Sequence, residues 1–162
     1  MCEGFNMEKN LRCCFAGHNK VYGEDIRESL AKTAELLITQ YGVKEFWIGN
    51  YGQFDFCARS ILQALKKEYA IEIDLVIPYL TKDICQNTDF YHKRFDNILM
   101  ADIPEKTPKR IYIIKANEYM INNSEFLICN VEYPWGGAAK TLEYAKRRKL
   151  QIFNLSKNSR VI

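Results

Sequence analysis

Short apolar runs alternate along the chain with segments in which apolar residues recur every three to four positions. In segment 24–41, for example, Ile26, Leu30 and Ala34 fall on one face, as they do in an amphipathic helix. The run 125–131 (EFLICNV) is instead short and almost wholly apolar, which is typical of a strand buried on both faces. The alternation predicts strands connected by helices.

The same criteria locate the other elements. We expect strands at 11–16, 45–49, 71–80, 110–114, 125–131 and 151–155. We expect helices at 24–41, 54–69, 88–99, 117–122 and 141–149. Parallel strands need crossover connections, so this order predicts an α/β fold with a mainly parallel sheet and helices on both faces.

Charge and composition indicate one ordinary globular domain. The chain has 162 residues, 48% of them apolar, and a formal net charge of +3. Its basic residues cluster locally at 146–149 (KRRK), late in a predicted helix, where cations complement the helix dipole. A footprint on nucleic acid needs a broader basic face, so the charge pattern argues against nucleic acid as a partner.

Cysteine and histidine usage gives no sign of a metal site. The six cysteines form no C-x-x-C pair, and Cys13, Cys57 and Cys129 lie in apolar runs, where thiols behave as small hydrophobes. We therefore expect no metal, no cofactor, no disulfide framework and a cytoplasmic location. The first residues are polar and no apolar run is long enough for a bilayer, so we expect no membrane association.

Four segments follow predicted strands, and in a parallel sheet they converge on the edge where ligands bind. With Asn117, which precedes the strand 125–131, they supply the candidate ligand-binding residues Gly17, His18, Gly49, Gly52, Asp55, Pro78, Asn117, Trp135, Gly136, Gly137, Ala138, Lys140 and Thr141. The segment 134–143 is the most informative, because its paired glycines follow a strand and open a helix. Backbone N–H groups there can approach a phosphate, which indicates a nucleotide-like ligand.

Several of these side chains also have a purely structural interpretation. His18 can contact phosphate or ribose, act as an acid or base, or only bind nearby backbone. Asp55 can stabilise a helix dipole or bind a ligand hydroxyl. Trp135 and Tyr133 can stack on a base or only shield the loop, and Glu143 is either solvated or turned into the pocket.

Five segments together resemble a known superfamily. They are CCFAGH (13–18), GNYGQFD (49–55), LKKEY (65–69), ANEYMINNSEFLI (116–128) and GGAAKTLEYAKRRK (136–149). In order and spacing they resemble the SLOG superfamily, the Rossmann-like group that joins the Lonely Guy (LOG) proteins with the DprA/Smf domain. The resemblance is greatest to small bacterial and phage proteins of the YpsA/YoqJ type.

This resemblance covers residues 11 to 155, between an N-terminal extension at 1–10 and a tail at 156–162. It implies a Rossmann-like three-layer domain, a nucleotide pocket at the glycine loops and a homodimer. Several members of the superfamily resemble sensors of nucleotide signals rather than enzymes.

The LOG enzymes release a base from a nucleoside monophosphate and carry the motif P-G-G-x-G-T-x-x-E. Residues 136–137 match its paired glycines, and Glu143 falls at its glutamate. Ala139 and Lys140 replace its Gly-Thr, and Ala116 stands where these enzymes have an arginine. Because alanine cannot clamp phosphate in a bidentate way, we expect binding without turnover rather than hydrolysis.

The sequence leaves three functions, in this order. The first is binding, sensing or sequestering of a nucleotide-derived small molecule. The second is a LOG-like phosphoribohydrolase or deoxyribosyltransferase-like enzyme, with Glu143 stabilising an oxocarbenium-like state. The third is a single-stranded-DNA-binding or partner-binding protein, by analogy with the DprA side of the superfamily.

Overall fold

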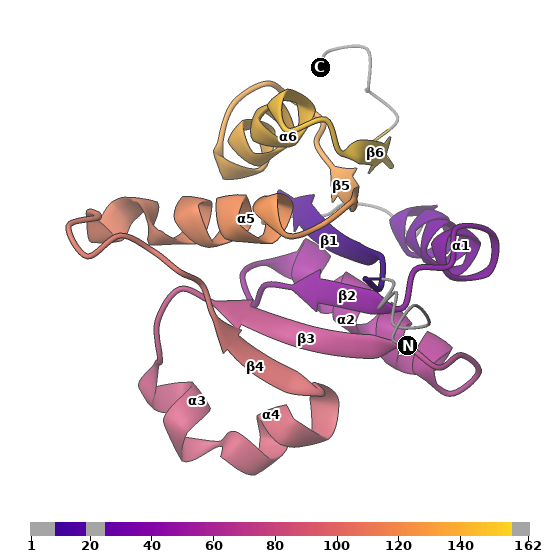
Figure 1. Ribbon diagram of the computed structural model, residues 1–162, viewed down its shortest axis with the longest axis horizontal. Helices are drawn as coiled ribbons and strands as arrows, with labels where there is room; N and C mark the ends of the chain where they lie inside the picture. Colours follow the sequence, from indigo (N-terminus) through magenta and orange to yellow (C-terminus); the bar gives the residue numbers. More distant parts are fainter. Residues whose placement is uncertain (1–8, 19–24, 157–162) are drawn as a thin grey trace, which may run out of the picture.

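The computed structural model describes residues 9–18 and 25–156, which form three layers around one sheet (Figure 1). The predicted extension at 1–10 and tail at 156–162 lie almost wholly outside these ranges. No helix of the described part is both long and apolar enough to cross a membrane.

The described sheet has six strands, and every neighbouring pair is parallel. Its order is β4-β3-β2-β1-β5-β6. The strands are β1 Arg12–Gly17, β2 Glu45–Ile48, β3 Glu72–Ile77, β4 Asn97–Met100, β5 Phe126–Asn130 and β6 Gln151–Asn154. The chain builds outward from β1 to β4 and then crosses back to β5, on the other side of β1. The point between β1 and β5 is thus the topological switch point, where folds of this class bind ligands.

Helices cover both faces of the sheet. The helices are α1 Asp25–Gln40, α2 Gln53–Lys66, α3 Lys82–Gln86, α4 Thr88–Arg94, α5 Tyr112–Asn122 and α6 Gly137–Arg147, and a short 3₁₀ turn, η1, spans Lys109–Ile111. One apolar core lies between the sheet and α1 with α2, and a second lies between the sheet and α5 with α6. Along β1, Phe15 points into the first core and Cys14 into the second. This double burial explains why the strands read as continuous apolar runs.

Two predicted elements are wrong. Residues 110–114 are not a strand but the 3₁₀ turn and the start of α5. Their apolar residues belong to the start of the helical pattern of α5, whose buried positions are Ala116, Met120 and Ile121. Periodicity in so short a run does not separate strand from helix.

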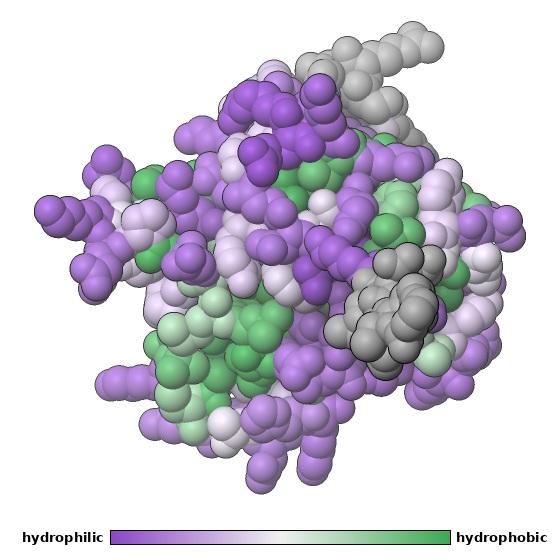
Figure 2. All heavy atoms as spheres, viewed as in Figure 1, coloured by the Kyte–Doolittle hydropathy of each residue, from purple (hydrophilic) through white to green (hydrophobic). Residues whose placement is uncertain are grey.

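The predicted helix at 88–99 is also wrong in its second half. Helix α4 ends at Arg94, and Phe95 is extended. The Asp96 backbone N–H donates to the Ile73 carbonyl, and the Asp96 carboxylate accepts from the Ile73 N–H, each at 2.8 Å. These two bonds turn the chain into the edge strand β4, a tertiary effect that no local pattern encodes. Hydrophobic side chains gather on the surface near α3 and the end of β4 (Figure 2).

Candidate functional site at the end of the sheet

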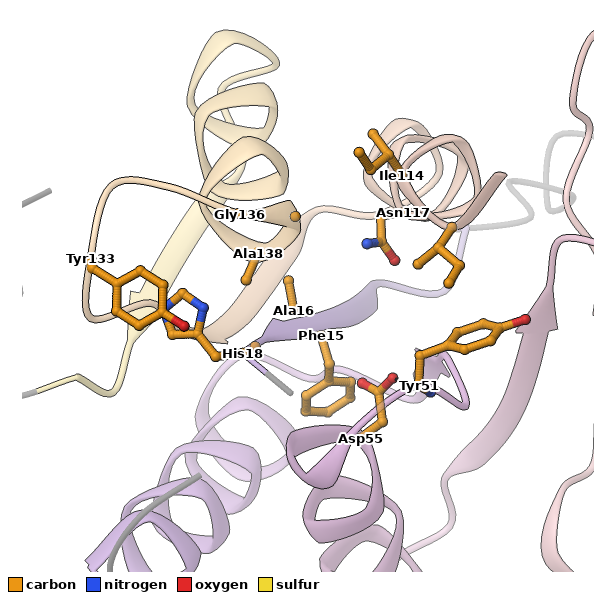
Figure 3. A pocket seen from close by; sticks show the side chains of 13 residues that line it. Phe15, Ala16, His18, Tyr51, Asp55, Ile114, Asn117, Tyr133, Gly136 and Ala138 are labelled. Carbon is orange, nitrogen blue, oxygen red and sulfur yellow. Dashed lines mark hydrogen bonds between the residues drawn. The ribbon is translucent and has the colours of Figure 1, made fainter. Parts of the chain in front are cut away.

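A cavity of about 290 Å³ lies at the C-terminal edge of the sheet, at the switch point between β1 and β5 (Figure 3). It brings together segments that are far apart in the sequence: the end of β1, the β2–α2 turn, helix α5 and the β5–α6 loop. The predicted site residues that line it are Gly17, His18, Asp55, Asn117, Gly136, Gly137 and Ala138.

The other predicted residues lie outside this cavity. Lys140, Thr141 and Glu143 line a separate depression between α5 and α6, together with Ile114 and Glu118 of α5. Pro78 is buried just after β3. Gly52 is the N-cap of α2 and has φ 97°. Gly49 and Trp135 lie next to the cavity, as described below.

The start of α6 forms one end of the cavity. Gly136 is the N-cap and has φ 92°, a left-handed conformation that favours glycine. No side chain caps this helix end, and its first turn has no acidic residue. The first N–H groups of a helix have no partner within it, so this end can receive an anion. The predicted helix at 141–149 therefore begins four residues too late, because Gly136 acts as its N-cap.

Helix α5 is tied to α6 beside this end. The Asn117 side-chain amide donates to the Thr141 hydroxyl at 3.2 Å, and that hydroxyl donates to the Gly137 carbonyl at 2.9 Å. Thr141 therefore positions Asn117 and the first helical turn without lining the cavity itself. The Asn117 oxygen points toward the cavity in Figure 3.

Three aromatic rings form a stacked ladder that begins at the cavity wall, which His18 and Tyr133 line, and ends outside the cavity at Trp135. The His18 and Tyr133 rings lie 3.7 Å apart between centroids, at 8°. The Tyr133 and Trp135 rings lie 4.5 Å apart, at 26°. Trp135 ends the ladder and is 66% exposed. Because stacking on the partly buried Tyr133 holds Trp135 in place, the exposed indole can stack with another planar ring.

His18 anchors the ladder as a neutral imidazole. Its Nε2 accepts a hydrogen bond from the Glu132 backbone N–H at 3.0 Å, so the ring proton is on Nδ1. Burial lowers the pKa of His18, and the nearby Glu132 carboxylate only partly opposes this shift. The ladder therefore carries no charge near neutral pH.

Asp55 lies at the other end of the cavity from the ladder (Figure 3). Its Oδ2 accepts the Tyr51 backbone N–H at 2.9 Å. Burial raises the pKa of Asp55 to about 7, although this hydrogen bond and Arg59 both lower it. A Cβ at Gly49 would lie 3.1 Å from Oδ2, so Gly49 makes room for this carboxyl group.

Three aromatic residues of the cavity wall, Phe15, Tyr51 and Tyr133, fall outside the predicted ligand-binding set, although the sequence indicates Tyr133 as a residue that can stack on a base. Tyr133 follows β5 two positions before Trp135, and that spacing is a usable signal for a stacked pair. Tyr51 gives no signal beyond its place in the glycine turn. No group of His, Cys, Asp and Glu side chains within residues 9–18 and 25–156 could hold a metal ion.

Comparison with known proteins finds similarity of fold alone. No protein-family model and no curated protein matches the sequence. Among solved structures, DNA processing protein A (DprA) from Streptococcus pneumoniae superposes with a TM-score of 0.64 at 16% identity, covering 90% of this chain and 50% of that one. DprA from Helicobacter pylori, in a structure that describes its single-stranded DNA binding mode, gives 0.63 at 15% identity, covering 89% and 64%.

These matches correct one prediction. The charge pattern argued against nucleic acid as a partner, yet a protein of this fold binds single-stranded DNA. The criterion of a broad basic face suits duplex footprints, whereas single strands are also held by stacking on aromatic rings. A local count of lysines and arginines therefore does not exclude such a partner.

The chain spans half to about two thirds of the length of these two proteins. DprA lies on one side of the superfamily that the sequence motifs resemble, so the fold agrees with that resemblance. The closer likeness to the YpsA/YoqJ type receives no support from these matches. What the comparison establishes is an α/β Rossmann-like fold of the kind found in DNA processing protein A.

Proposed function

We propose that the chain binds single-stranded nucleic acid at the C-terminal edge of its sheet. One base stacks on Trp135, and a neighbouring phosphate sits at the start of α6. The observation that carries the proposal is the ladder from His18 through Tyr133 to an exposed Trp135, beside a helix end that no side chain caps. The single-stranded DNA binding of a protein with the same fold supports it.

The ladder supplies the affinity for bases. Stacking of a base on an aromatic side chain is worth about 1–3 kcal/mol and tolerates any sequence. Because Trp135 already stacks on Tyr133, its side chain loses little conformational freedom when a base binds. The proposal therefore predicts binding with little base preference.

The start of α6 supplies the affinity for phosphate. A helix N-terminus carries about half a positive charge, and exposed Lys140 in the first turn adds a whole one. The cavity of about 290 Å³ is at the small end of ligand pockets. It admits a single nucleotide but no duplex, which favours a single strand.

Fluorescence anisotropy with a labelled oligothymidylate at low salt tests the proposal. Trp135→Ala is expected to weaken binding by about 5- to 150-fold, the equivalent of one stacked base. Trp135→Phe keeps a ring and is expected to retain most of the affinity. A wild-type protein that does not bind the oligonucleotide overturns the proposal.

A second candidate is a nucleotide-derived small molecule, and Asp55 favours it. The strand proposal does not use this carboxyl group, which lies far enough inside the cavity to bind a ribose hydroxyl or a base edge. Thermal shifts with AMP, ADP-ribose and cyclic nucleotides test it. The expected result is a stabilisation that Asp55→Ala removes, and no stabilisation by any of them counts against this candidate.

The enzyme alternative has less support from the geometry. Glu143 is 55% exposed, pairs with Lys146 at 3.3 Å and lies outside the cavity. Ala116, at the position of the LOG arginine, is buried in the core between α5 and the sheet. Release of free base from nucleoside monophosphates, lost in Glu143→Gln, is the outcome that this alternative requires.

A further inference from the structure

Two arginines on neighbouring helices each lie over an exposed phenylalanine ring. The Arg59 guanidinium lies 4.3 Å from the Phe56 ring centroid on α2, and the Arg94 guanidinium lies 3.5 Å from the Phe90 centroid on α4. Phe56 is 57% exposed and Phe90 42%. Each pair thus presents a large ring and a delocalised cation together at the surface.

The two arginines are close to one another. Burial lowers the pKa of Arg59, and the positive charge of Arg94 lowers it further. The helices are tied together here, because the Gln63 side-chain amide donates to the Arg94 carbonyl at 3.3 Å. Two cations held near each other in this way repel, and an anion placed between them removes that repulsion.

An open groove of about 530 Å³ continues from this point between the C-terminal ends of α2 and α4. Its wall carries Lys66, Lys67, Lys93 and Arg94 against one acidic side chain, Asp96. Asp96 is already paired with Lys66, and no ion-pair partner is found for Lys67 or Lys93 within the described ranges. The groove therefore has an excess of positive charge.

Helix α2 lines both the cavity, through Asp55, and the groove, through Gln63, and these two residues with Arg59 recur every four positions on one face of the helix. Arg59 lies one helical turn beyond Asp55, at the cavity end of α2. Helix α2 has 14 residues, so it spans about 21 Å from the cavity to the far end of the groove.

Helix dipoles account for only part of this arrangement. The basic residues Lys66, Lys93 and Arg94 lie in the last turns of their helices, where cations are favoured. Arg59 lies in the first half of α2, where the dipole gives it no advantage. The exposure of Phe56 and Phe90 also has no origin in a dipole.

We propose that this surface, the α2–α4 track, is a second contact region for the same single strand. The strand is anchored in the cavity and continues past Arg59 and Arg94 toward Lys67 and Lys93, which contact its phosphates, while Phe56 and Phe90 stack on its bases. The proposal rests on the proposed function, because it concerns the path of that strand beyond the cavity.

Oligothymidylates of about four and about 16 nucleotides separate the two regions, because they bracket the site sizes of single-strand binders. Wild-type protein is expected to bind the longer one more tightly and with a steeper salt dependence. The double variant Arg59→Ala/Arg94→Ala is expected to bind the longer strand as weakly as the shorter one. Its salt slope is expected to fall by about 0.7 for each phosphate that the variant no longer neutralises.

Matched variants make the result specific to the track. Lys32→Ala removes an exposed lysine of α1, paired with Glu28 at 3.0 Å, and is expected to change neither affinity. Phe56→Ala and Phe90→Ala are expected to weaken binding of the longer strand alone. Arg94→Lys keeps the charge and is expected to preserve the salt slope.

Failure of the track and failure of the cavity site give different results. If Trp135→Ala weakens both oligonucleotides while the double variant binds the longer one as wild type does, the track is overturned and the cavity site stands. If the wild-type protein binds neither oligonucleotide at low salt, both proposals are overturned.

Discussion

Nε2 of His18 accepts a hydrogen bond of 3.0 Å from the backbone N–H of Glu132, and this bond joins the end of β1 to the loop that follows β5. The two segments are more than a hundred residues apart in the sequence. The bond fixes the imidazole proton on Nδ1 and the plane of the ring on which Tyr133 stacks. The position of the exposed Trp135 thus depends on the hydrogen bond between His18 and Glu132 at the inner end of the ladder.

Acidification is expected to break this contact. The folded-state pKa of His18 lies below its ordinary value of about 6.5, so the unfolded state binds the proton more readily. The stability that neutral His18 contributes is present above about pH 6.5 and is lost as the pH falls through the lower, folded-state pKa. Protonated Nε2 cannot accept from Glu132, so affinity for the strand is expected to fall in the same range.

His18→Phe tests this prediction, because it keeps a ring in the ladder but cannot titrate. It is expected to lower stability at neutral pH by about 0.5–1.5 kcal/mol, the value of one hydrogen bond. It is also expected to lose the acid-induced drop in affinity. Both proteins are measured in an Asp55→Asn background, because protonation of Asp55 would raise stability as the pH falls and would mask the loss due to His18. An unchanged drop in His18→Phe contradicts the assignment.

Tyr133→Ala is expected to weaken oligonucleotide binding although Tyr133 is not the outermost ring. It removes both stacking pairs, each worth about 0.5–1.5 kcal/mol, and leaves Trp135 free to rotate. Tyr133→Phe keeps both pairs and is expected to bind as wild type does. Anisotropy titrations of the two variants check this, and equal affinities argue that the ladder does not position Trp135.

Asp55→Asn is expected to stabilise the protein in mildly alkaline solution. Because the folded pKa is raised to about 7, from an ordinary value of about 3.9, the folded state loses stability as the pH rises through that interval. The amide keeps an acceptor for the Tyr51 N–H and has no charge to desolvate. We expect a gain of about 1–2 kcal/mol near pH 8, because water at the cavity mouth screens part of the shift.

Urea denaturation near pH 8 and near pH 5 measures this effect. The gain is expected to be larger at the higher pH, where the folded wild-type protein must hold the carboxylate ionised. A gain that does not change with pH points to a packing effect instead.

The sequence predicts the sheet, its parallel direction and the edge at which the candidate site lies, because these follow from buried apolar runs and helical spacing. It does not predict β4, since Asn97–Met100 becomes a strand only through the bonds between Asp96 and Ile73. Long-range pairing of this kind has no local signature.

The sequence also predicts only one part of the proposed site. It predicts the glycine pair at 136–137, because a strand followed by two glycines and a helix commonly forms an anion-binding turn. The sequence does not predict the proposed α2–α4 track, because Arg59 and Arg94 come from helices that are separated by strand β3 and helix α3. Residue charges that are scattered along the chain meet only after folding, and a count of adjacent basic residues cannot find them.

Glycine substitutions at the two ends of the cavity are expected to act in opposite ways. A Cβ at Gly17 would lie 2.3 Å from a ring carbon of Phe54, a fully buried residue in the first turn of α2. Gly17→Ala is therefore expected to destabilise the fold by about 1–3 kcal/mol through overpacking. A Cβ at Gly137 meets no described atom within 4 Å, and alanine is preferred to glycine in helices.

Gly137→Ala is accordingly expected to leave stability unchanged or raise it by up to about 1 kcal/mol. Its methyl group, however, stands at the exposed start of α6, where the phosphate is proposed to bind, so affinity for the oligonucleotide is expected to fall. Thermal melts and anisotropy titrations of the two variants separate these effects. A Gly137→Ala protein that is more stable and binds as tightly as wild type removes the start of α6 from the binding site.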